Sequence, residues 1–455
     1  MPDREFDVVV MGAGPPGEVC AGRLAEGGAK VAIVEPHLVG GECSFYACMP
    51  SKALLRPAEV LAEVRRVPGA AEAVTGDLDT GAALRRRDEV IHDLDDSSQL
   101  PWLEERGIEL FRGSGVLDGE RRVKVGDDVL VAQKAVVVAT GSDASIPPIE
   151  GLREAEPWDN RQATTAKEVP ESLVILGGGP VGAEMAQAWQ SFGADVALVE
   201  AMDRLLPNEE PFAGEQVADA LREHGVDVRT GAKASAVRAE DGAVTVELEA
   251  GDSVRSEELL VAIGRTARTD GIGLETVGVE VERWLEVDDQ MRVGGSDWLY
   301  AIGDVNGRAL LTHMGKYQAR LAADHILGKD VTATADRRGS PRVTFTDPEV
   351  AAAGLTLAAA REDGINVRAV DLETSATAGA SFHGRNTPGT TRIVVDEDRR
   401  VIVGATFVGS ETAEFVHAAT IAIVGEVPVD ELWHAVPAFP TRSEVWLKLM
   451  EAYGL

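Results

Sequence analysis

The chain has 455 residues, 44% of them apolar, and its 76 Asp and Glu against 44 Lys and Arg give a net charge of −32. A chain of this length is too long to fold around one hydrophobic core, so we expect about three or four domain-sized parts. No apolar run approaches the roughly 18 residues of a membrane span. The negative charge argues against nucleic-acid or anionic-membrane partners, whose phosphates the chain would repel, and three cysteines in this length argue for a reducing cytoplasm rather than a disulfide scaffold.

The first predicted elements form a dinucleotide-binding unit. Residues 6–11 read as a buried parallel strand, a glycine-rich turn of the pattern GxGxxG follows at once, and then come a helix over 18–26 and an apolar strand over 31–34. Glycines permit the tight turn and let the backbone approach a pyrophosphate at the helix N-terminus, and an acid that closes the second strand accepts a hydrogen bond from a ribose hydroxyl. The candidate binding residues are Gly12, Gly14, Gly17 and Glu35.

Two cysteines follow in the stretch GGECSFYACMPSK, which runs from Gly40 to Lys52. A structural zinc ion would need four ligands, and neither a CxxC motif nor a histidine pair supplies them near Cys43 and Cys48. Residues five apart in a regular helix have Cα atoms roughly 8–9 Å apart, whereas a disulfide needs less than about 7 Å. We therefore expect Cys43 on irregular backbone just before, or at the start of, the helix that carries Cys48. A position at a helix N-terminus lowers the pKa of a thiol, which favours a pair that opens and closes.

The dinucleotide-binding pattern occurs a second time. An apolar strand over 173–176 leads into another GxGxxG turn and a helix, and a strand over 195–199 ends at an acid that is as far from the first glycine as in the first copy. Two such sites imply two dinucleotides, most simply a flavin and a nicotinamide. The residues of the second site are Gly177, Gly179, Gly182 and Glu200. A carboxylate at Glu200 suits the free 2′-hydroxyl of NAD and repels the 2′-phosphate of NADP, unless this side chain simply faces solvent, so we expect NADH to be preferred.

Five stretches together resemble the class I pyridine nucleotide–disulfide oxidoreductases, the family of lipoamide dehydrogenase, glutathione reductase and mercuric reductase. They are the cysteine stretch and residues 139–141, 262–265, 300–304 and 345–349, in the family's order and spacing over essentially the whole chain. The resemblance implies an α/β fold with two Rossmann-like domains, for FAD and NAD, and a C-terminal α+β dimerisation domain that forms a homodimer. The expected parts are an FAD domain over 1–147, an NAD(P) domain over 148–268, a second part of the FAD domain over 269–338, and the dimerisation domain over 339–455.

The resemblance also implies roles for single residues. Cys48 is expected to be the charge-transfer thiol against the flavin, and Cys43 the interchange thiol that faces a small-molecule substrate. Lys52 is expected to pair with Glu184 beside the flavin N5, where hydride arrives. The remaining residues expected near the cofactors are Thr140, Gly141, Gly264, Gly303, Asp304 and His313, and the last of these is expected to act more through its backbone than through its imidazole.

The sequence departs from the family in its C-terminal part. Disulfide-reducing relatives carry a motif of the form His-Pro-Thr-x-Ser-Glu, whose imidazole shuttles protons between thiols across the dimer. Here residues 438–444 read AFPTRSE, so Phe439 stands at the base position and Glu444 has no imidazole to orient. A positioned base typically contributes about 10²–10⁴ in rate, so we expect inefficient turnover of lipoamide. His434, five residues upstream, is expected on an ordinary helix face.

Two explanations of Phe439 remain. The disulfide cycle can persist on a substrate whose leaving thiol is acidic and needs no proton, which the retention of both cysteines favours. Alternatively, the enzyme is a quinone or dye reductase or a soluble NAD(P) transhydrogenase in which Phe439 forms a stacking wall. A flavin-binding subunit without redox activity is disfavoured, because both cysteines, Lys52 and Glu184 are present.

Overall fold

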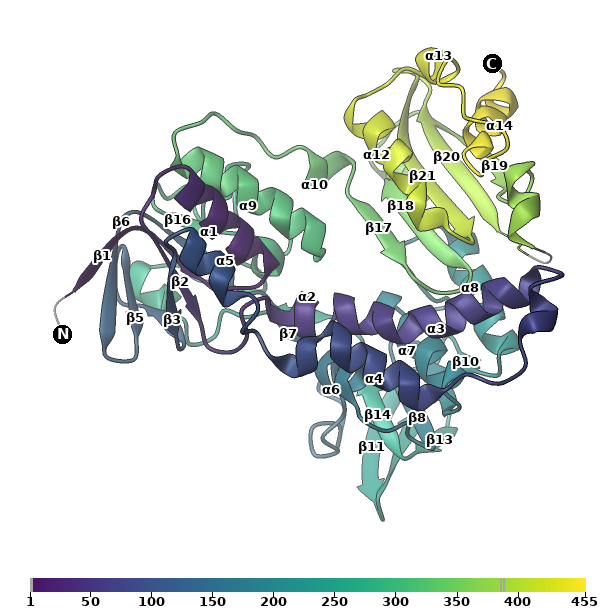
Figure 1. The fold of residues 1–455 in the computed structure, drawn as a ribbon, viewed down its shortest axis with the longest axis horizontal. Coiled ribbons are helices and arrows are strands. Elements are labelled where there is room, and N and C mark those ends of the chain that lie inside the picture. The colour runs from purple at the N-terminus through teal and green to yellow at the C-terminus, as the bar shows by residue number, and fades with distance from the viewer. Residues whose placement is uncertain (1–2, 385–386, 388) are drawn as a thin grey trace. The chain divides into compact units, whose positions relative to one another are not determined.

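The computed structural model describes residues 3–384, 387 and 389–455, and the chain forms two compact units (Figure 1). The first unit comprises the residues up to Pro50, Asp88–Ala144 and Arg265–Arg337, and the second comprises Ser51–Arg87, Ser145–Gly264 and the residues from Arg338 onward. Three of the junctions, after residues 144, 264 and 337, fall near the boundaries expected at 147, 268 and 338, whereas residues 51–87, expected in the FAD domain, belong to the second unit. The division into the expected domains stays a prediction. No helix in the described part of the chain is both long and apolar enough to cross a membrane.

The first unit is built on a seven-stranded sheet in the order β3-β2-β1-β6-β5-β4, with β16 also pairing with β6. Its strands are β1 (Arg4–Met11), β2 (Val31–Glu35), β3 (Glu109–Arg112), β4 (Gly115–Leu117), β5 (Arg122–Val125), β6 (Asp128–Val138) and β16 (Leu299–Ala301). The pairs β1–β2, β2–β3, β1–β6 and β6–β16 are parallel, whereas β4–β5 and β5–β6 are antiparallel. This is the doubly wound arrangement that the first glycine-rich pattern predicted.

Both faces of β1, a central strand of this sheet, are buried, which explains its continuous run of valines. Val8 and Val10 point into one core, while Val9 and Met11 point into another on the opposite face. Helices α1 (Pro15–Glu26) and α9 (Thr312–Ile326) lie side by side over the first of these cores (Figure 1). This shared core holds α1 and α9 together, although they lie far apart in the sequence.

The first unit also contains short elements that frame its loops. They are α2 (Gly41–Phe45), α5 (Leu100–Glu105), the strands β7 (Ser142–Ala144) and β15 (Arg265–Ala267), and the 3-10 turns η2 (His92–Leu94), η3 (Leu274–Val277) and η4 (Gly303–Asn306). The two short strands pair antiparallel with each other.

The second unit contains the second glycine-rich pattern on a four-stranded parallel sheet of order β10-β9-β8-β14. Its strands are β8 (Ser172–Leu176), β9 (Asp195–Val199), β10 (Asp227–Arg229) and β14 (Glu258–Val261), and an antiparallel sheet of β11 (Ala234–Glu240), β12 (Ala243–Leu248) and β13 (Ser253–Ser256) accompanies it. The helices of this part are α3 (Cys48–Arg66), α4 (Thr80–Val90), α6 (Asn160–Thr165), α7 (Pro180–Ser191) and α8 (Pro211–Glu223), with the 3-10 turn η1 (Ala71–Ala73). The first three residues of α3, including Cys48, and the last three of α4 belong to the first unit. Side chains of β8 again alternate between two cores, and Trp189 of α7 is fully buried in one of them.

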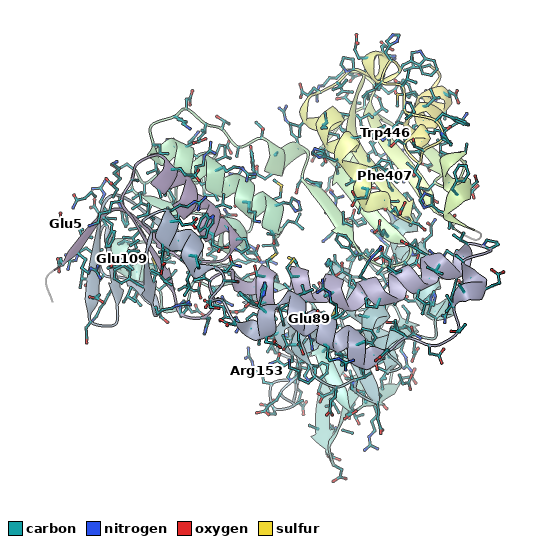
Figure 2. All side chains as sticks on the ribbon, viewed as in Figure 1. Glu5, Glu89, Glu109, Arg153, Phe407 and Trp446 are labelled. Atoms are coloured by element: carbon teal, nitrogen blue, oxygen red, sulfur yellow. The ribbon has the colours of Figure 1, made fainter. Side chains whose placement is uncertain are left out.

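The C-terminal part of the second unit is an α+β structure, as expected. Its antiparallel sheet has the order β17-β18-β21-β20-β19, with β17 (Pro341–Thr344), β18 (Glu349–Gly354), β19 (Val367–Glu373), β20 (Thr390–Asp396) and β21 (Val401–Gly409). The remaining elements are α10 (Ala335–Arg338), α11 (Leu357–Glu362), α12 (Val416–Val424), α13 (Val429–Leu432), α14 (Glu444–Tyr453), η5 (Gly379–His383) and η6 (Thr412–Glu414). Phe407 of β21 packs against Trp446 of α14 with ring centroids 5.6 Å apart (Figure 2). The fold class predicted from the sequence is therefore confirmed.

Candidate active site

The first glycine-rich turn has the geometry that a dinucleotide needs. Gly12 has a φ of 110°, and a Cβ added there would lie 2.3 Å from the Ala139 carbonyl oxygen. A Cβ on Gly17 would lie 2.0 Å from the Gly12 oxygen, so close packing of helix on strand requires glycine. Gly14, by contrast, caps α1 and has no atom nearer to its added Cβ than Pro16 Cδ at 4.0 Å. The open side at Gly14 leaves the helix N-terminus accessible to a pyrophosphate, so these residues fit a bound FAD.

The second turn repeats this geometry residue for residue. Gly177 has a φ of 108°, and its added Cβ would lie 2.5 Å from the Ala262 oxygen. A Cβ on Gly182 would lie 1.8 Å from the Gly177 oxygen, whereas nothing lies within 4 Å at Gly179, which caps α7. The second turn therefore fits a second dinucleotide, NAD(H), in the same way.

The two closing acids are buried and hold the two turns in shape. Glu35 accepts hydrogen bonds from the backbone N–H groups of Ala13 and His37, both at 2.8 Å. Glu200 accepts from the N–H groups of Gly178 at 2.5 Å and Met202 at 2.6 Å. Because Glu200 is only 8% exposed, the alternative that it simply faces solvent is wrong. Each carboxylate keeps further lone pairs, and their use by a ribose hydroxyl stays a prediction.

Cys43 and Cys48 lie on two separate helices, and no disulfide joins them in this structure. Cys43 is inside the one-turn helix α2, and Cys48 is the first residue of α3. The expectation of irregular backbone at Cys43 is therefore wrong, because the irregular backbone lies between the cysteines, where Tyr46 has a φ of −134°. The physical reason is that Gly40, with a φ of 110°, turns the chain so that a new helix begins at once.

The two thiols interact with each other and with a hydroxyl group from α9. A hydrogen bond with Cys48 and then burial raise the pKa of Cys43, and a hydrogen bond from Thr312 and the charge of Lys316 act in the opposite direction. The prediction of a lowered pKa is thus wrong for Cys43 in the dithiol form, because hydrogen bonding and burial outweigh the effect of the helix terminus. Thr312 Oγ1 lies 3.3 Å from Cys48 Sγ. Sequence reasoning missed Thr312, although it directly precedes His313 at the start of the expected helix.

The third cysteine has no part in this site. Cys20 is fully buried in α1, and burial raises the pKa of its thiol to about 12. It packs as an apolar side chain in the core that α1 and α9 share.

Lys52 and Glu184 form the predicted ion pair. The Nζ atom of Lys52 lies 2.7 Å from Oε2 of Glu184, which is 4% exposed. The other carboxylate oxygen accepts a hydrogen bond of 2.9 Å from the backbone N–H of Phe345, and Lys52 Nζ stands 4.7 Å from the centroid of the Phe345 ring. Phe345 thus holds both partners, a role that the sequence did not reveal. The expected function of the pair at a flavin stays a prediction.

The remaining residues of the expected FAD site are joined by hydrogen bonds within the first unit. Thr140 Oγ1 donates to the Arg268 carbonyl at 2.7 Å, and the carbonyl of Gly141, whose φ is 77°, accepts from the Arg268 N–H at 3.0 Å. Ser142 Oγ donates to Asp304 Oδ2 at 2.7 Å, which ties this turn to the stretch 300–304 that resembles the family. Ser142 is a further residue that the sequence analysis did not identify.

Three other predicted residues occupy turns or helix starts. Gly303 has a φ of 76° and donates its N–H to Gln318 Oε1 at 2.9 Å. Gly264 has a φ of 145°, and its carbonyl accepts from the Ser145 N–H at 2.9 Å. His313 is the second residue of α9, so its backbone lies in the first turn of that helix, as expected.

Phe439 and Glu444 lie in the C-terminal part of the second unit, and their roles in the reaction stay predictions. Phe439 is 76% exposed. His434 is exposed as well, but the expectation of a helix face is wrong, because α13 ends at Leu432 and His434 lies in the turn that follows. Glu444 starts α14, and its Oε2 accepts a hydrogen bond of 3.1 Å from the Gly379 N–H. This carboxylate therefore serves as a structural acceptor for backbone.

Comparisons with known proteins agree with this geometry. Residues 6–322 match the family model described as pyridine nucleotide-disulphide oxidoreductase, and residues 340–450 match the dimerisation domain of the same family. The dihydrolipoyl dehydrogenases of Zymomonas mobilis and Thermus scotoductus are 31% and 33% identical, over 99% of this chain and 98% and 97% of theirs. The Cu(II) complex of the HOCl-induced flavoprotein disulfide reductase RclA from Escherichia coli has a TM-score of 0.87 and 26% identity, over 99% of both chains. LpdA from Mycobacterium tuberculosis has a TM-score of 0.86 at 24% identity, over 99% of this chain and all of that one, and shares the fold.

Proposed function

The chain belongs to the pyridine nucleotide–disulphide oxidoreductase family as an FAD-dependent NAD(P)H disulfide oxidoreductase, and we propose that its electrons leave through Cys43 and Cys48. The observation that carries this proposal is the hydrogen-bonded thiol pair in the same unit as the first glycine-rich turn, with Thr312 Oγ1 3.3 Å from Cys48 Sγ. Thr140, Gly141, Gly303, Asp304 and the residues of the first glycine-rich turn would hold the FAD.

Each residue of the pair has a defined part in the cycle. Bound FAD would accept hydride from NADH and pass on its two electrons. Two electrons and one proton break the Cys43–Cys48 disulfide and leave two sulfur atoms that share the proton. The Thr312 hydroxyl, hydrogen-bonded to Cys48, favours the thiolate there. The Cys43 thiolate attacks one sulfur of an external disulfide and releases the first thiolate product. Cys48 then attacks the Cys43 sulfur, which re-forms the internal disulfide and releases the second.

The acceptor that suits this site is a small disulfide with an acidic leaving thiol. Phe439 supplies no imidazole to protonate a basic thiolate, so aromatic disulfides should turn over faster than lipoamide. The expected homodimer and a small-molecule substrate accord with the dimerisation domain. We place the enzyme in the cytoplasm, without nucleic-acid or membrane partners, because it has three cysteines and a net charge of −32.

A second candidate acceptor is Cu(II), because the structurally similar RclA has been solved as a Cu(II) complex. Two Cu(II) ions would each take one electron from the reduced sulfur pair, giving two Cu(I) ions and the disulfide and releasing the shared proton. A metal ion needs no protonated leaving group, which fits the phenylalanine at position 439. Across the described residues no group of three or more His, Cys, Asp or Glu side chains is placed to hold a metal, so copper would be a substrate.

Anaerobic titration of the pure holoenzyme with NADH tests the proposal. We expect a long-wavelength charge-transfer band at two electrons per subunit, because a Cys48 thiolate would then lie against oxidised flavin. The matched sample is a Cys48→Ser variant, in which the flavin should be reduced directly without this band. Flavin bleaching without any band in the unmodified enzyme would contradict the proposed route.

The preference for NADH is tested at Glu200. In Glu200→Gln the amide oxygen still accepts one backbone hydrogen bond, but the negative charge that repels a 2′-phosphate is gone. We expect kcat/KM for NADPH relative to NADH to rise about tenfold, since roughly one unit charge of repulsion is removed. Asp203→Asn, which removes an exposed charge nearby, is the control and should leave the ratio unchanged. An unchanged ratio in Glu200→Gln would remove Glu200 from coenzyme selection.

A further inference from the structure

With no imidazole at position 439, the proton that Cys43 gives up needs another carrier. This need arises only if the cycle runs through Cys43, so a carrier at this thiol rests on the proposed function. In the first unit, Glu18 of α1 and Lys316 of α9 each follow, by one helical turn, a residue that contacts a helix carrying a cysteine.

Helix α1 approaches the cysteines through its N-terminal turn. A Cβ added to Gly41, the first residue of α2, would lie 2.7 Å from Gly14 Cα, so the helix that carries Cys43 begins directly against the cap of α1. Glu18 lies one turn further along α1, since its N–H donates to the Gly14 carbonyl at 3.0 Å. Residues four apart share one face of a helix, which places Glu18 on the side that α2 contacts.

Helix α9 also approaches the cysteines through its N-terminal turn. Its first residue, Thr312, touches Cys48, and Lys316 follows one helical turn later on the same face. Gly315 lets α9 pack closely against α1, because a Cβ added to Gly315 would lie only 2.6 Å from Cγ of Pro16. Figure 1 shows the two helices running side by side. Because Lys316 directly follows Gly315 and Glu18 is two residues after Pro16, both belong to the first turns of α9 and α1, which meet at this contact.

The electrostatics agree with this placement. The positive charge of Lys316 acts on both groups, lowering the pKa of the Cys43 thiol and that of the Glu18 carboxyl. The pKa of Glu18 is raised to about 7, because burial, the largest effect, and the charge of Glu35 on β2 together outweigh the lowering by Lys316. Cys48 and Thr312 are the other groups that act on Cys43. A carboxyl group that titrates near neutrality can both take and return a proton.

We propose that Glu18 and Lys316 of the same subunit replace the missing base, with Lys316 stabilising the Cys43 thiolate and Glu18 holding the proton that this thiol gives up. After two-electron reduction, the proton shared by the sulfur atoms moves to the Glu18 carboxylate and leaves Cys43 as a thiolate. When this thiolate attacks an external disulfide, one S–S bond forms as another breaks, and the leaving thiolate takes the proton from Glu18. The second thiolate product, released as Cys48 closes the internal disulfide, takes a proton from solvent. The substrate range would thereby include alkyl disulfides, whose basic thiolates need a proton to leave.

The test is the rate at which NADH-reduced holoenzyme reacts with two probes, bis(2-hydroxyethyl) disulfide and 4,4′-dithiodipyridine, measured by stopped flow. Only the first releases a basic thiolate, so loss of the proton donor slows that probe alone. In Glu18→Gln we expect the ratio of the dithiodipyridine rate to the alkyl rate to rise about tenfold, because the alkyl thiolate must then leave without a proton from Glu18. A tenfold change corresponds to roughly one pKa unit. Glu26→Gln, an exposed acid on the same helix, is the matched control.

The pH profile gives a second reading with a definite sign. Below about pH 7 the rate with the alkyl disulfide rises with pH, because a growing fraction of Cys43 is thiolate. Above about pH 7 Glu18 loses the proton that it would donate as fast as Cys43 gains thiolate, so the rate levels off. In Glu18→Gln the rate should instead continue to rise through pH 8. An overall loss of structure would not produce that change of shape.

Lys316 is tested independently, in case Glu18→Gln fails to retain FAD. Lys316→Met should slow both probes about tenfold, Lys316→Arg should restore the rates, and Arg320→Met, an exposed charge one turn further along α9, should change neither. Unchanged probe ratios, pH profile and rates in the Glu18 and Lys316 variants would overturn the inference. That result differs from failure of the proposed function, which would show as turnover that survives the loss of Cys43.

Discussion

Replacing Cys43 with serine is expected to reduce disulfide turnover by at least about 10³-fold, because a hydroxyl group cannot replace the attacking thiolate. Reduction of the bound flavin by NADH should continue at the normal rate, since hydride transfer precedes the thiol step. Steady-state assays with 4,4′-dithiodipyridine and with Cu(II), together with anaerobic stopped-flow measurement of flavin reduction, separate the two steps.

Cys20→Ala is the matched control for this experiment. It removes the third cysteine, which is fully buried in α1, and should leave disulfide turnover intact. If Cys43→Ser keeps nearly full activity on quinones or dyes, electrons leave the flavin directly, and the enzyme is better described as a quinone reductase or transhydrogenase.

The second large effect is expected at Phe439. Phe439→His restores an imidazole at the position where the family motif carries one, and we expect the rate of lipoamide turnover to rise between about tenfold and hundredfold. The gain is smaller than a base can give in full, because Glu18 already holds the proton in our account and Glu444 is engaged with the Gly379 N–H. Because Phe439 is 76% exposed, the substitution should not disturb folding.

Phe439→Leu separates the effect of the base from that of removing an aromatic ring. It should not raise lipoamide turnover, and the pH profile of Phe439→His should gain an inflection near the ordinary pKa of histidine, about 6.5. If lipoamide turnover does not rise at all in Phe439→His, our interpretation of this position as the missing base is mistaken.

The two dinucleotide turns were predictable because their requirements are local. Gly12 and Gly177 need positive φ, and Gly17 and Gly182 leave no room for a Cβ, so these positions appear in the sequence as glycines at fixed spacing. The acids that close the second strand of each pattern were equally visible. The sequence did not reveal that Glu35 and Glu200 each accept hydrogen bonds from two backbone N–H groups, because hydrogen bonds from backbone to side chains leave no pattern in the sequence.

The surroundings of the cysteines were harder to predict, because distant segments supply them. Thr312 and Lys316 lie some 260 residues from the cysteines, and only the packing of α9 against α1 brings them near. The pKa of Cys43 was misjudged for the same reason, since the helix terminus is visible in the sequence but the partner thiol's hydrogen bond and the burial are not. Glu184 was found only through the family resemblance, and Phe345, which holds it, was not found.

The same NADH titration, read by differential alkylation and mass spectrometry, tests the central claim most directly. Before NADH is added, Cys43 and Cys48 of the oxidised holoenzyme should resist alkylation as a disulfide. After one equivalent of NADH per subunit, both should be alkylated, while Cys20 stays protected in its core. If the flavin is reduced while alkylation of Cys43 and Cys48 is the same before and after, electrons do not pass through this pair and the account fails.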